Sequence, residues 1–300
     1  MTPHGPASDR GERVRFSLVV ATFGRTDEVR SLLLSLAGQL EQGFEVVVVD
    51  QNDDDRLTPV LAAFAGQMRL RRLRSGVRQL SHAKNLGMQA CSGEIIGFPD
   101  DDCLYPAGVL QAAYRHLADD GALTFVSGPA VTGAGQLGSG RWAGRSGPVS
   151  MANIWTTVIA FNFFVRRAAA LEAGGFDEEL GIGARFGSAE ETDFAIRLLR
   201  GGGKGHYDFG LRVLHPDKAL TPRAVERAFD YGAGLGRVLR KHDVGLSTTL
   251  TFAVRPLGGA ALSLLRRRTL AASYYWMTLR GRVAGFLAAP SGASGRGAGA

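Results

Sequence analysis

Cysteine is scarce in this chain, which contains only Cys91 and Cys103 among 300 residues. Two thiols cannot supply the disulfide framework of a small secreted fold, and their spacing is not that of a structural zinc site. Both observations favour a reducing compartment. Residues 1–14 are polar and lack the apolar segment that is typical of a secretory signal. We therefore expect a cytoplasmic protein in which residues 1–14 are disordered.

Long apolar runs are absent as well. No uninterrupted apolar stretch reaches about 20 residues, the length that an α-helix needs to cross a bilayer. The most apolar part of the chain lies near the C-terminus, where Arg255 and Pro256 interrupt it. A transmembrane helix is therefore not expected, whereas an amphipathic helix that lies in the membrane interface is compatible with the sequence.

Acidic residues are almost missing from the C-terminal part. Residues 223–300 hold 12 basic and 3 acidic residues, whereas residues 1–222 hold 23 basic and 25 acidic residues. Apolar stretches separate the C-terminal arginines, so we expect no nucleic acid as a partner. We predict a helical extension over residues 223–288 that either binds an anionic membrane surface peripherally, from the cytoplasmic side, or packs on the preceding domain. Residues 289–300 have the composition of a flexible tail.

The rest of the chain alternates between strand-like and helix-like segments. The strand-like segments are FSLVVA (16–21), VVVVD (46–50), RLRRLR (69–74) and EIIGF (94–98). The helix-like segments begin near Thr26 and Ser81, which can cap a helix, and at Thr58-Pro59. A strand as apolar as VVVVD is covered on both faces, and RLRRLR has the alternation of an edge strand. The pattern predicts an α/β fold over residues 15–222, with a mostly parallel central sheet flanked by helices and ligands beyond the carboxyl ends of the strands.

Three consecutive aspartates, Asp100 to Asp102, follow the strand EIIGF. Their mutual repulsion raises the cost of ionising all three, so we expect a positive charge beside them. In an extended segment Asp100 and Asp102 point to the same side and can hold a hard cation. Mg²⁺ or Mn²⁺ in such a site usually also binds a ligand's phosphates, which indicates a diphosphate ligand. A solvated acidic turn is the alternative that this stretch alone leaves open.

Five separated segments resemble glycosyltransferase family 2, whose members have the Rossmann-like GT-A fold of nucleotide-diphospho-sugar transferases. They are SLVVATFGR (17–25), VVVVDQNDDDR (46–56), GEIIGFPDDDCLYP (93–106), GGFDEELGIG (174–183) and GSAEETDFAIRLL (187–199). The resemblance spans roughly residues 15–220. It implies a metal-dependent, inverting enzyme that moves a sugar from a nucleoside diphosphate sugar to a hydroxyl of a carbohydrate or lipid-linked acceptor, in polysaccharide or glycolipid assembly. The implied cofactor is Mg²⁺ or Mn²⁺.

The resemblance also implies a donor site at the ends of the first strands. Its expected members are Thr22, Phe23 and Arg25 along the nucleotide pocket, Asp50 at the base, Asp100 and Asp101 beside the ribose and diphosphate, and Asp102 on the metal. Asp50 could instead end its strand and cap the following turn. Lys84 stands where the family commonly has arginine, so it offers a phosphate a point charge and no bidentate fork. Arg78 is a second phosphate candidate, and Asn85 is expected to reach a ligand or a neighbouring loop.

The acidic segment Glu190-Glu191-Thr192-Asp193 resembles the family pattern E-D-x-D, with glutamate where the base is usually aspartate. The resemblance implies that Glu191 takes the proton of the acceptor hydroxyl and that Glu190 contacts substrate. Ser188 and Glu191 also match a capping box, and in that case Asp193 is the candidate base. Acidic first turns are common without catalysis, because the helix dipole favours carboxylates there.

His215 follows an apolar strand and precedes a proline. The family often has a histidine at this place, so the resemblance implies that a neutral imidazole completes the metal site opposite Asp102. A histidine bonded to a loop carbonyl is the alternative reading.

Residues 132–155 are rich in glycine and are expected to form no core element. Trp155 at the end of this segment offers an aromatic face to a sugar ring or an apolar acceptor. The segment is then either a mobile flap over bound substrate or an ordinary packed loop.

Two other classes of function are compatible with the sequence. A metal-dependent nucleotidyltransferase or phosphohydrolase would use a similar sheet and cation. A non-catalytic nucleotide-sugar binding module would tolerate the unusual Lys84 and Glu191. The released nucleotide distinguishes the three, because only sugar transfer yields a free nucleoside diphosphate.

Overall fold

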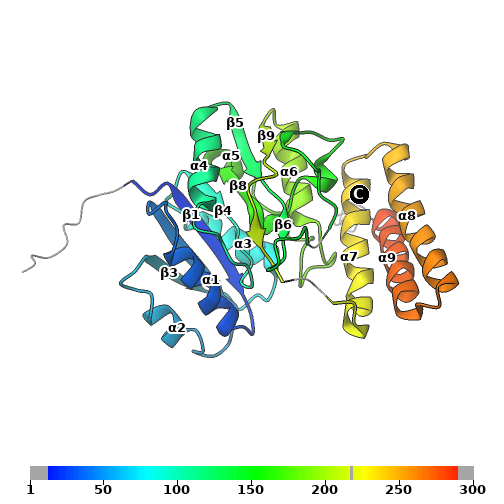
Figure 1. The fold of residues 1–300 in the computed structure, drawn as a ribbon, viewed down its shortest axis with the longest axis horizontal. Coiled ribbons are helices and arrows are strands. Elements are labelled where there is room, and N and C mark those ends of the chain that lie inside the picture. Colours follow the sequence, from blue (N-terminus) through cyan, green and yellow to red (C-terminus); the bar gives the residue numbers. More distant parts are fainter. Residues whose placement is uncertain (1–12, 139, 217–218, 290–300) are drawn as a thin grey trace, which may run out of the picture.

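The computed structural model of the protein describes residues 13–138, 140–216 and 219–289. The segments expected to be a disordered N-terminus and a flexible tail lie almost entirely outside the described residues. A sheet with helices packed on it forms the larger part of the molecule, and three long C-terminal helices stand beside it (Figure 1).

The central sheet of the described chain has eight strands in the order β3-β2-β1-β4-β8-β5-β9-β7. β3, β2, β1 and β4 run parallel to one another, and β8 runs antiparallel to β4 and β5. The strands are β1 (Phe16–Thr22), β2 (Phe44–Asp50), β3 (Arg69–Arg74), β4 (Ile95–Gly97), β5 (Leu123–Ser127), β7 (Gly147–Val149), β8 (Phe163–Arg166) and β9 (Lys204–Tyr207). The predicted mostly parallel sheet is confirmed, with RLRRLR as its edge strand.

Two apolar layers cover the two faces of the sheet, and β1 divides its side chains between them. Leu18 and Val20 belong to one layer and Val19 to the other, and all three are 0% exposed. Burying each such side chain stabilises the fold by about 1.5–3 kcal/mol. The first layer also contains α1 (Asp27–Ala37), α2 (Thr58–Ala62) and α4 (Val109–Asp119), and the second contains α3 (Leu80–Gln89), α5 (Arg167–Glu172) and α6 (Glu190–Arg200). Apolar strands covered on both faces are therefore confirmed.

The register of the parallel strands places three carboxyl ends side by side. Thr22 at the end of β1 pairs with Asp50 at the end of β2. On the other side of β1, Ala21 forms a parallel bridge with Asp100, just beyond β4. The aspartates that lie 50 positions apart in the sequence therefore flank one strand end, where ligands of such sheets bind.

Three predicted helix caps differ from the structure. Ser81 lies inside α3, and its hydroxyl donates to the carbonyl of Leu180. Ala189, with φ 68°, occupies the N-cap position of α6, while Ser188 donates its hydroxyl to the carbonyl of Tyr231. The predicted capping box is therefore wrong, because a distant segment takes the Ser188 hydroxyl. Thr26 does precede α1 but forms no side-chain capping bond.

The glycine-rich segment 132–155 contributes to the sheet. β7 pairs antiparallel with β9 at the edge of the sheet, and Ile154–Thr156 forms a 3₁₀ helix. The expectation that this segment forms no core element is therefore wrong. A strand pairs through its backbone, so low side-chain hydrophobicity does not prevent it from adding to an existing sheet edge.

The C-terminal part forms α7 (Pro222–Lys241), α8 (Leu246–Leu265) and α9 (Thr269–Leu287), as the predicted helical extension requires. α7 and α9 approach to backbone contact through G-x-x-x-G pairs on both helices. A methyl group on Gly236 would lie 2.1 Å from the carbonyl oxygen of Arg282, and one on Gly281 would lie 2.0 Å from that of Phe229. Small residues at such positions permit close packing of helices. α8 lies outermost, at the end of the molecule remote from the sheet (Figure 1).

Candidate active site

The side chain of Arg25, in the loop after β1, lies against the acidic run that follows β4. Nη1 of Arg25 is 2.8 Å from Oδ1 of Asp101 and 2.6 Å from Oδ2 of Asp102. Burial raises the pKa of Asp101 to about 6, although Arg25 opposes this shift. The positive charge expected beside the three aspartates is therefore present, and it comes from a residue predicted to line the nucleotide pocket.

Four potential metal ligands meet beside this ion pair. One ligand atom from each of Asp100, Asp102, Cys103 and His215 lies within 4.8 Å of the others. The two residues predicted to bind metal, Asp102 and His215, are thus brought together from the ends of distant segments. Asp100, predicted to lie beside the ribose and diphosphate, belongs to the same cluster.

The orientation of His215 suits a ligand. Nδ1 is 2.8 Å from the carbonyl oxygen of Pro216, and because a carbonyl only accepts, Nδ1 carries a proton. The ring stacks on Phe161 with centroids 4.6 Å apart. Nε2 faces Oδ1 of Asp102 at 3.4 Å. Two lone pairs at this distance repel each other unless a proton or a cation lies between them.

The donor set fits a hard divalent cation. Carboxylate oxygens and a neutral imidazole bind Mn²⁺, and the carboxylates alone suit Mg²⁺. Burial raises the pKa of Asp100, against the effect of Lys84 and His215, so a cation beside it would stabilise the ionised form. Burial also raises the pKa of the Cys103 thiol well above its usual value. A neutral thiol is a weak ligand, which leaves Asp100, Asp102 and His215 as the residues that could hold the ion.

A buried ion pair joins this cluster to the acidic helix α6. Nζ of Lys84 on α3 is 3.0 Å from Oε1 of Glu190, and both side chains are less than a tenth exposed. Lys84 also lies over the ring of Phe176, with Nζ 5.1 Å from the centroid. Burial alone would lower the pKa of Lys84, but Glu190, Asp100 and Glu191 together raise it. Lys84 is therefore the positive centre between two groups of carboxylates.

The carboxyl group of Glu191 has a raised pKa. Burial, followed by the neighbouring Glu190, raises the pKa of Glu191 to about 8, although Lys84 opposes the shift. A carboxylate with a pKa near the working pH combines basicity with a usable ionised fraction. The capping bond that would have occupied Glu191 is absent among the described contacts of α6.

Asp193 instead forms an interhelical network. Oδ1 accepts from Nζ of Lys241 at 2.7 Å and lies 2.8 Å from Nε2 of His242, both at the end of α7, while Oδ2 accepts from Nε of Arg197 at 2.8 Å. Burial alone would raise the pKa of Asp193, but His242, Arg197 and Lys241 hold it well below its usual range. A side chain that is 0% exposed and so strongly stabilised as an anion is a poor base. The geometry therefore favours Glu191 over Asp193.

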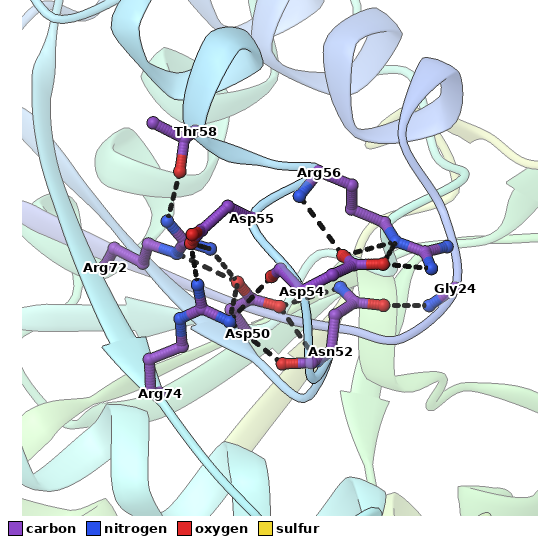
Figure 2. A network of polar contacts seen from close by, with 9 residues as sticks. All are labelled: Gly24, Asp50, Asn52, Asp54, Asp55, Arg56, Thr58, Arg72 and Arg74. Atoms are coloured by element: carbon purple, nitrogen blue, oxygen red, sulfur yellow. Dashed lines mark hydrogen bonds and ion pairs between the residues drawn. The ribbon is translucent and has the colours of Figure 1, made fainter.

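Asp50 lies at the centre of a second polar network (Figure 2). Oδ2 accepts from Nε and Nη2 of Arg72 at 2.9 and 2.5 Å, and Oδ1 accepts from the backbone and side-chain nitrogens of Asn52 at 2.9 and 2.7 Å. Nη1 of Arg74 lies 3.7 Å from Oδ2 of Asp50. Oδ1 of Asn52 in turn accepts from the backbone nitrogen of Gly24. Asp50 therefore both caps its own turn and ties β2, β3 and the loop after β1 together.

The remaining predicted site residues lie in three separate places. Phe23 is exposed beside Arg78, whose guanidinium lies 4.6 Å above the ring centroid. These two residues form an open rim, in which Arg78 also pairs with Asp53. The side-chain amide of Asn85 is fully used by a neighbouring loop: it donates to the carbonyl of Phe176 and accepts from the backbone nitrogen of the same residue. Trp155 is half-buried and packs edge-to-face on Phe252 of α8, with centroids 5.2 Å apart.

The sequence reasoning missed Arg72, Arg74 and Cys103 as members of these clusters. The register of β3 against β2 places Arg72 opposite Val48 and Arg74 opposite Asp50. The arginines of RLRRLR could therefore have predicted a partner for Asp50, because their long side chains reach from an edge strand over the end of the adjacent strand. Cys103 follows Asp102 directly in the sequence, but no metal-binding motif includes a cysteine at this position, so the sequence did not predict it as a member of the cluster.

This sheet, with carboxylates at the end of β2 and just beyond β4 on either side of β1, has the arrangement of a nucleotide-binding enzyme of the GT-A fold. A sequence model named Glycosyl transferase family 2 matches residues 17–172, which is more than half of the chain. The chain therefore belongs to glycosyl transferase family 2. Comparison with curated protein sequences finds no match.

Solved structures share the fold at low sequence identity. The mannosyltransferase PcManGT from Pyrobaculum calidifontis, in complex with GDP-Man and Mn²⁺, has a TM-score of 0.67 and 18% identity, covering 95% of this chain and 91% of that one. TarS 1-349 from S. aureus in complex with UDP-GlcNAc has a TM-score of 0.58 and 15% identity, covering 89% of this chain and 90% of that one. At these identities the likeness shows the shared GT-A fold.

Proposed function

We propose that this protein is an inverting glycosyltransferase that moves a sugar from a nucleoside diphosphate sugar to an acceptor hydroxyl. The observation that carries the proposal is the position of Lys84 between two carboxylate groups. Nζ of Lys84 lies 3.0 Å from Glu190 at the start of α6, and Asp100, just beyond β4, and Glu191 both raise the pKa of its ammonium group. A donor site and a base are thereby adjacent, although their residues are about 90 positions apart.

The donor would bind across the ends of β1, β2 and β4. Thr22 and the open rim of Phe23 and Arg78 would line the nucleotide, with the base toward Asp50. Arg25 would move from the carboxylates to the diphosphate or remain between them, because an arginine fork matches phosphate oxygens as well as carboxylates. In support, the two solved structures named above contain a nucleoside diphosphate sugar in the same fold.

Asp102 and His215, together with Asp100, would hold Mg²⁺ or Mn²⁺, and a bound cation would neutralise the charge of the departing nucleoside diphosphate. The solved structure of PcManGT contains Mn²⁺. Asp101, which pairs with Arg25, would keep that guanidinium beside the diphosphate.

The proton transfer follows from the basicity of Glu191. The acceptor oxygen attacks the anomeric carbon while the bond from that carbon to the diphosphate oxygen breaks, and the hydroxyl proton passes to the Glu191 carboxylate. One displacement inverts the anomeric configuration. Glu190 remains paired with Lys84 and fixes the first turn of α6, so that Glu191 points to the same place in each turnover.

The acceptor is assigned to the carbohydrate or lipid-linked class, in polysaccharide or glycolipid assembly. The half-buried Trp155 would contact it from the segment that joins the two halves of the domain. We place the enzyme in the cytoplasm, peripherally on the membrane, because the C-terminal extension is basic and apolar.

Incubation with Mn²⁺ and a panel of nucleotide sugars tests the function. We expect a free nucleoside diphosphate to appear, with an inverted anomeric centre in the product by NMR. Release of pyrophosphate or inorganic phosphate would indicate a nucleotidyltransferase or phosphohydrolase. Saturable nucleotide-sugar binding without turnover across acceptors would indicate a binding module.

A further inference from the structure

The outer face of α8 is apolar and exposed along its whole length. Its members, here called the apolar stripe, are Leu246, Leu250, Val254, Leu257, Leu264 and Leu265, each between 51% and 82% exposed. From Leu246 to Leu257 they recur every three or four residues, and Leu264 lies two turns beyond Leu257, so they share one helix face, with Leu265 at its edge. The inner face is lined by smaller or polar residues such as Pro256, Ala260 and Ser263, which are buried. The usual amphipathic arrangement of a surface helix is thus reversed.

The charge around the apolar stripe has one sign. Residues 244–289 contain six arginines and no aspartate, glutamate or lysine. Arg266, Arg267 and Arg268 follow the last leucines of the stripe, and all three are exposed. Trp276 of α9, 51% exposed, adds an aromatic side chain of the kind enriched at membrane–water interfaces.

We infer that the apolar stripe and Arg266 to Arg268 form a docking surface for an anionic lipid bilayer. The leucines enter the boundary between headgroups and acyl chains, while the arginines bind lipid phosphates from above. Apolar area and basic charge combined on one helix face provide the two attractions that stable interfacial binding requires.

The other occupants fit less well. A second copy of the chain would bring the arginines of both copies together with no acidic residue on α8 or α9 to pair with them. α8 is the one helix of the described residues with the length and composition to cross a bilayer. Crossing would carry Arg255 into the hydrocarbon core and would separate α8 from α9, to which it is bound by a hydrogen bond from Arg282 to the carbonyl of Phe252.

The docking surface is connected to α6, the helix that carries Glu191, through a short segment of the chain. α8 begins four residues after His242, whose ring lies 2.8 Å from Asp193, two positions beyond Glu191. Phe252 of α8 also contacts Trp155, the residue proposed to meet the acceptor. Docking would therefore hold the acceptor side of the site near the bilayer, where a lipid-linked acceptor lies. This consequence rests on the proposed glycosyltransferase activity, whereas the docking specifies the peripheral membrane placement proposed above and does not require that activity.

Sedimentation with vesicles tests the inference on the full chain. One set of vesicles contains equal parts of phosphatidylcholine and phosphatidylglycerol, and the other contains phosphatidylcholine alone. We expect the protein to sediment with the anionic set and to be released progressively as salt is added. Leu250→Glu/Val254→Glu/Leu257→Glu should lower the partition coefficient at least about tenfold. Arg266→Gln/Arg267→Gln/Arg268→Gln should lower it on anionic vesicles only.

The matched control is Leu34→Glu/Leu40→Glu, which alters two equally exposed leucines of the catalytic domain and should leave vesicle binding unchanged. Circular dichroism and thermal unfolding check that each variant folds. Lipids brominated on the acyl chain should quench a fluorescence component that Trp276→Phe removes. Each of these results supports the docking surface.

Three outcomes would overturn the docking surface. The first is that the stripe variant binds vesicles as well as the parent chain does. The second is that the parent chain binds no vesicles and forms a dimer that the stripe variant converts to a monomer, and the third is that the bound protein resists carbonate extraction, which would indicate a spanning helix. Release of nucleoside diphosphate without vesicles is assayed in parallel. Its absence would contradict the proposed glycosyltransferase and leave the vesicle result intact.

Discussion

Nζ of Lys84 lies 3.0 Å from Oε1 of Glu190, and this buried ion pair joins α3 to the first residue of α6. Removing one partner leaves the other as an uncompensated buried charge. Lys84→Met should therefore lower the free energy of unfolding by about 3–5 kcal/mol, measured by urea denaturation. The double variant Lys84→Met/Glu190→Gln should be less destabilised than the sum of the two single variants, because neither charge remains.

The control for this prediction is an exposed ion pair of the same domain. Arg56→Met breaks the contact with Asp54 at the surface and should leave the urea midpoint almost unchanged. Equal effects of Lys84→Met and Arg56→Met would show that the buried pair does not hold α6 on α3.

Glu191 should control the pH dependence of transfer. Only the ionised carboxylate accepts a proton, so kcat/KM should rise as pH increases through the pKa of about 8 and then level off. Glu191→Gln should lower transfer on the order of 100-fold or more and remove this limb. Glu191→Asp should retain the limb at a reduced rate. An unchanged pH profile in Glu191→Gln would assign the base to another residue.

The Glu191 carboxylate that would support activity should also lower the stability of the folded protein. The folded pKa of about 8 exceeds that of an unfolded glutamate, so the stabilising contribution of protonated Glu191 is complete below the unfolded pKa and is lost as pH rises through the folded one. Glu191→Gln removes the buried charge. Its Tm should therefore exceed that of the parent chain at neutral and alkaline pH, and the two Tm values should converge only as the pH falls below the pKa of an unfolded glutamate. A lower Tm at alkaline pH would contradict the raised pKa.

Asp193 should behave in the opposite way. Its pKa is depressed in the folded state, so its stabilising contribution is present above the pKa of an unfolded aspartate and is lost as pH falls toward the folded one. Asp193→Asn should lower the free energy of unfolding at neutral pH by about 3–5 kcal/mol, and the difference from the parent chain should shrink in acid. Asp177→Asn is the milder control, because it removes only one contact of Lys241. Loss of transfer by fully folded Asp193→Asn, equal to that of Glu191→Gln, would restore Asp193 as a candidate base.

Much of the fold could be predicted because strong local patterns and the tertiary structure agree. The continuous valines of β2 are buried on both faces, and the arginines of RLRRLR alternate at a sheet edge. The helix caps could not be predicted. The hydroxyls of Ser81 and Ser188 bond to carbonyls 99 and 43 positions away, and no local pattern reports these partners.

The structure brings several of the proposed site residues together, but the sequence did not predict their individual contacts. Asp102 and His215 could be placed together only by the resemblance to a family, since 113 positions separate them. The engagement of Asp50 by Arg72 depends on the register of β2 and β3, which hydrophobic patterning leaves undetermined. The assignment of Asp193 depends on Lys241 at the end of α7 and on His242 directly after it, which approach Asp193 from a distant part of the chain.

The orientation of His215 gives a specific prediction about metal dependence. The carbonyl of Pro216 holds the proton on Nδ1 and leaves Nε2 facing Asp102 at 3.4 Å, so this nitrogen should contribute to cation affinity. Chelation should abolish transfer, and Mn²⁺ or Mg²⁺ should restore it. His215→Asn should raise the Mn²⁺ concentration for half-maximal activity at least about tenfold, with a smaller change in kcat at saturating Mn²⁺. His116→Asn, which removes a histidine paired with Asp208 outside this cluster, should leave the Mn²⁺ requirement unchanged. An equal Mn²⁺ requirement in the two variants would mean that Nε2 of His215 is not a ligand, and that the imidazole instead pairs with Asp102 as a cation.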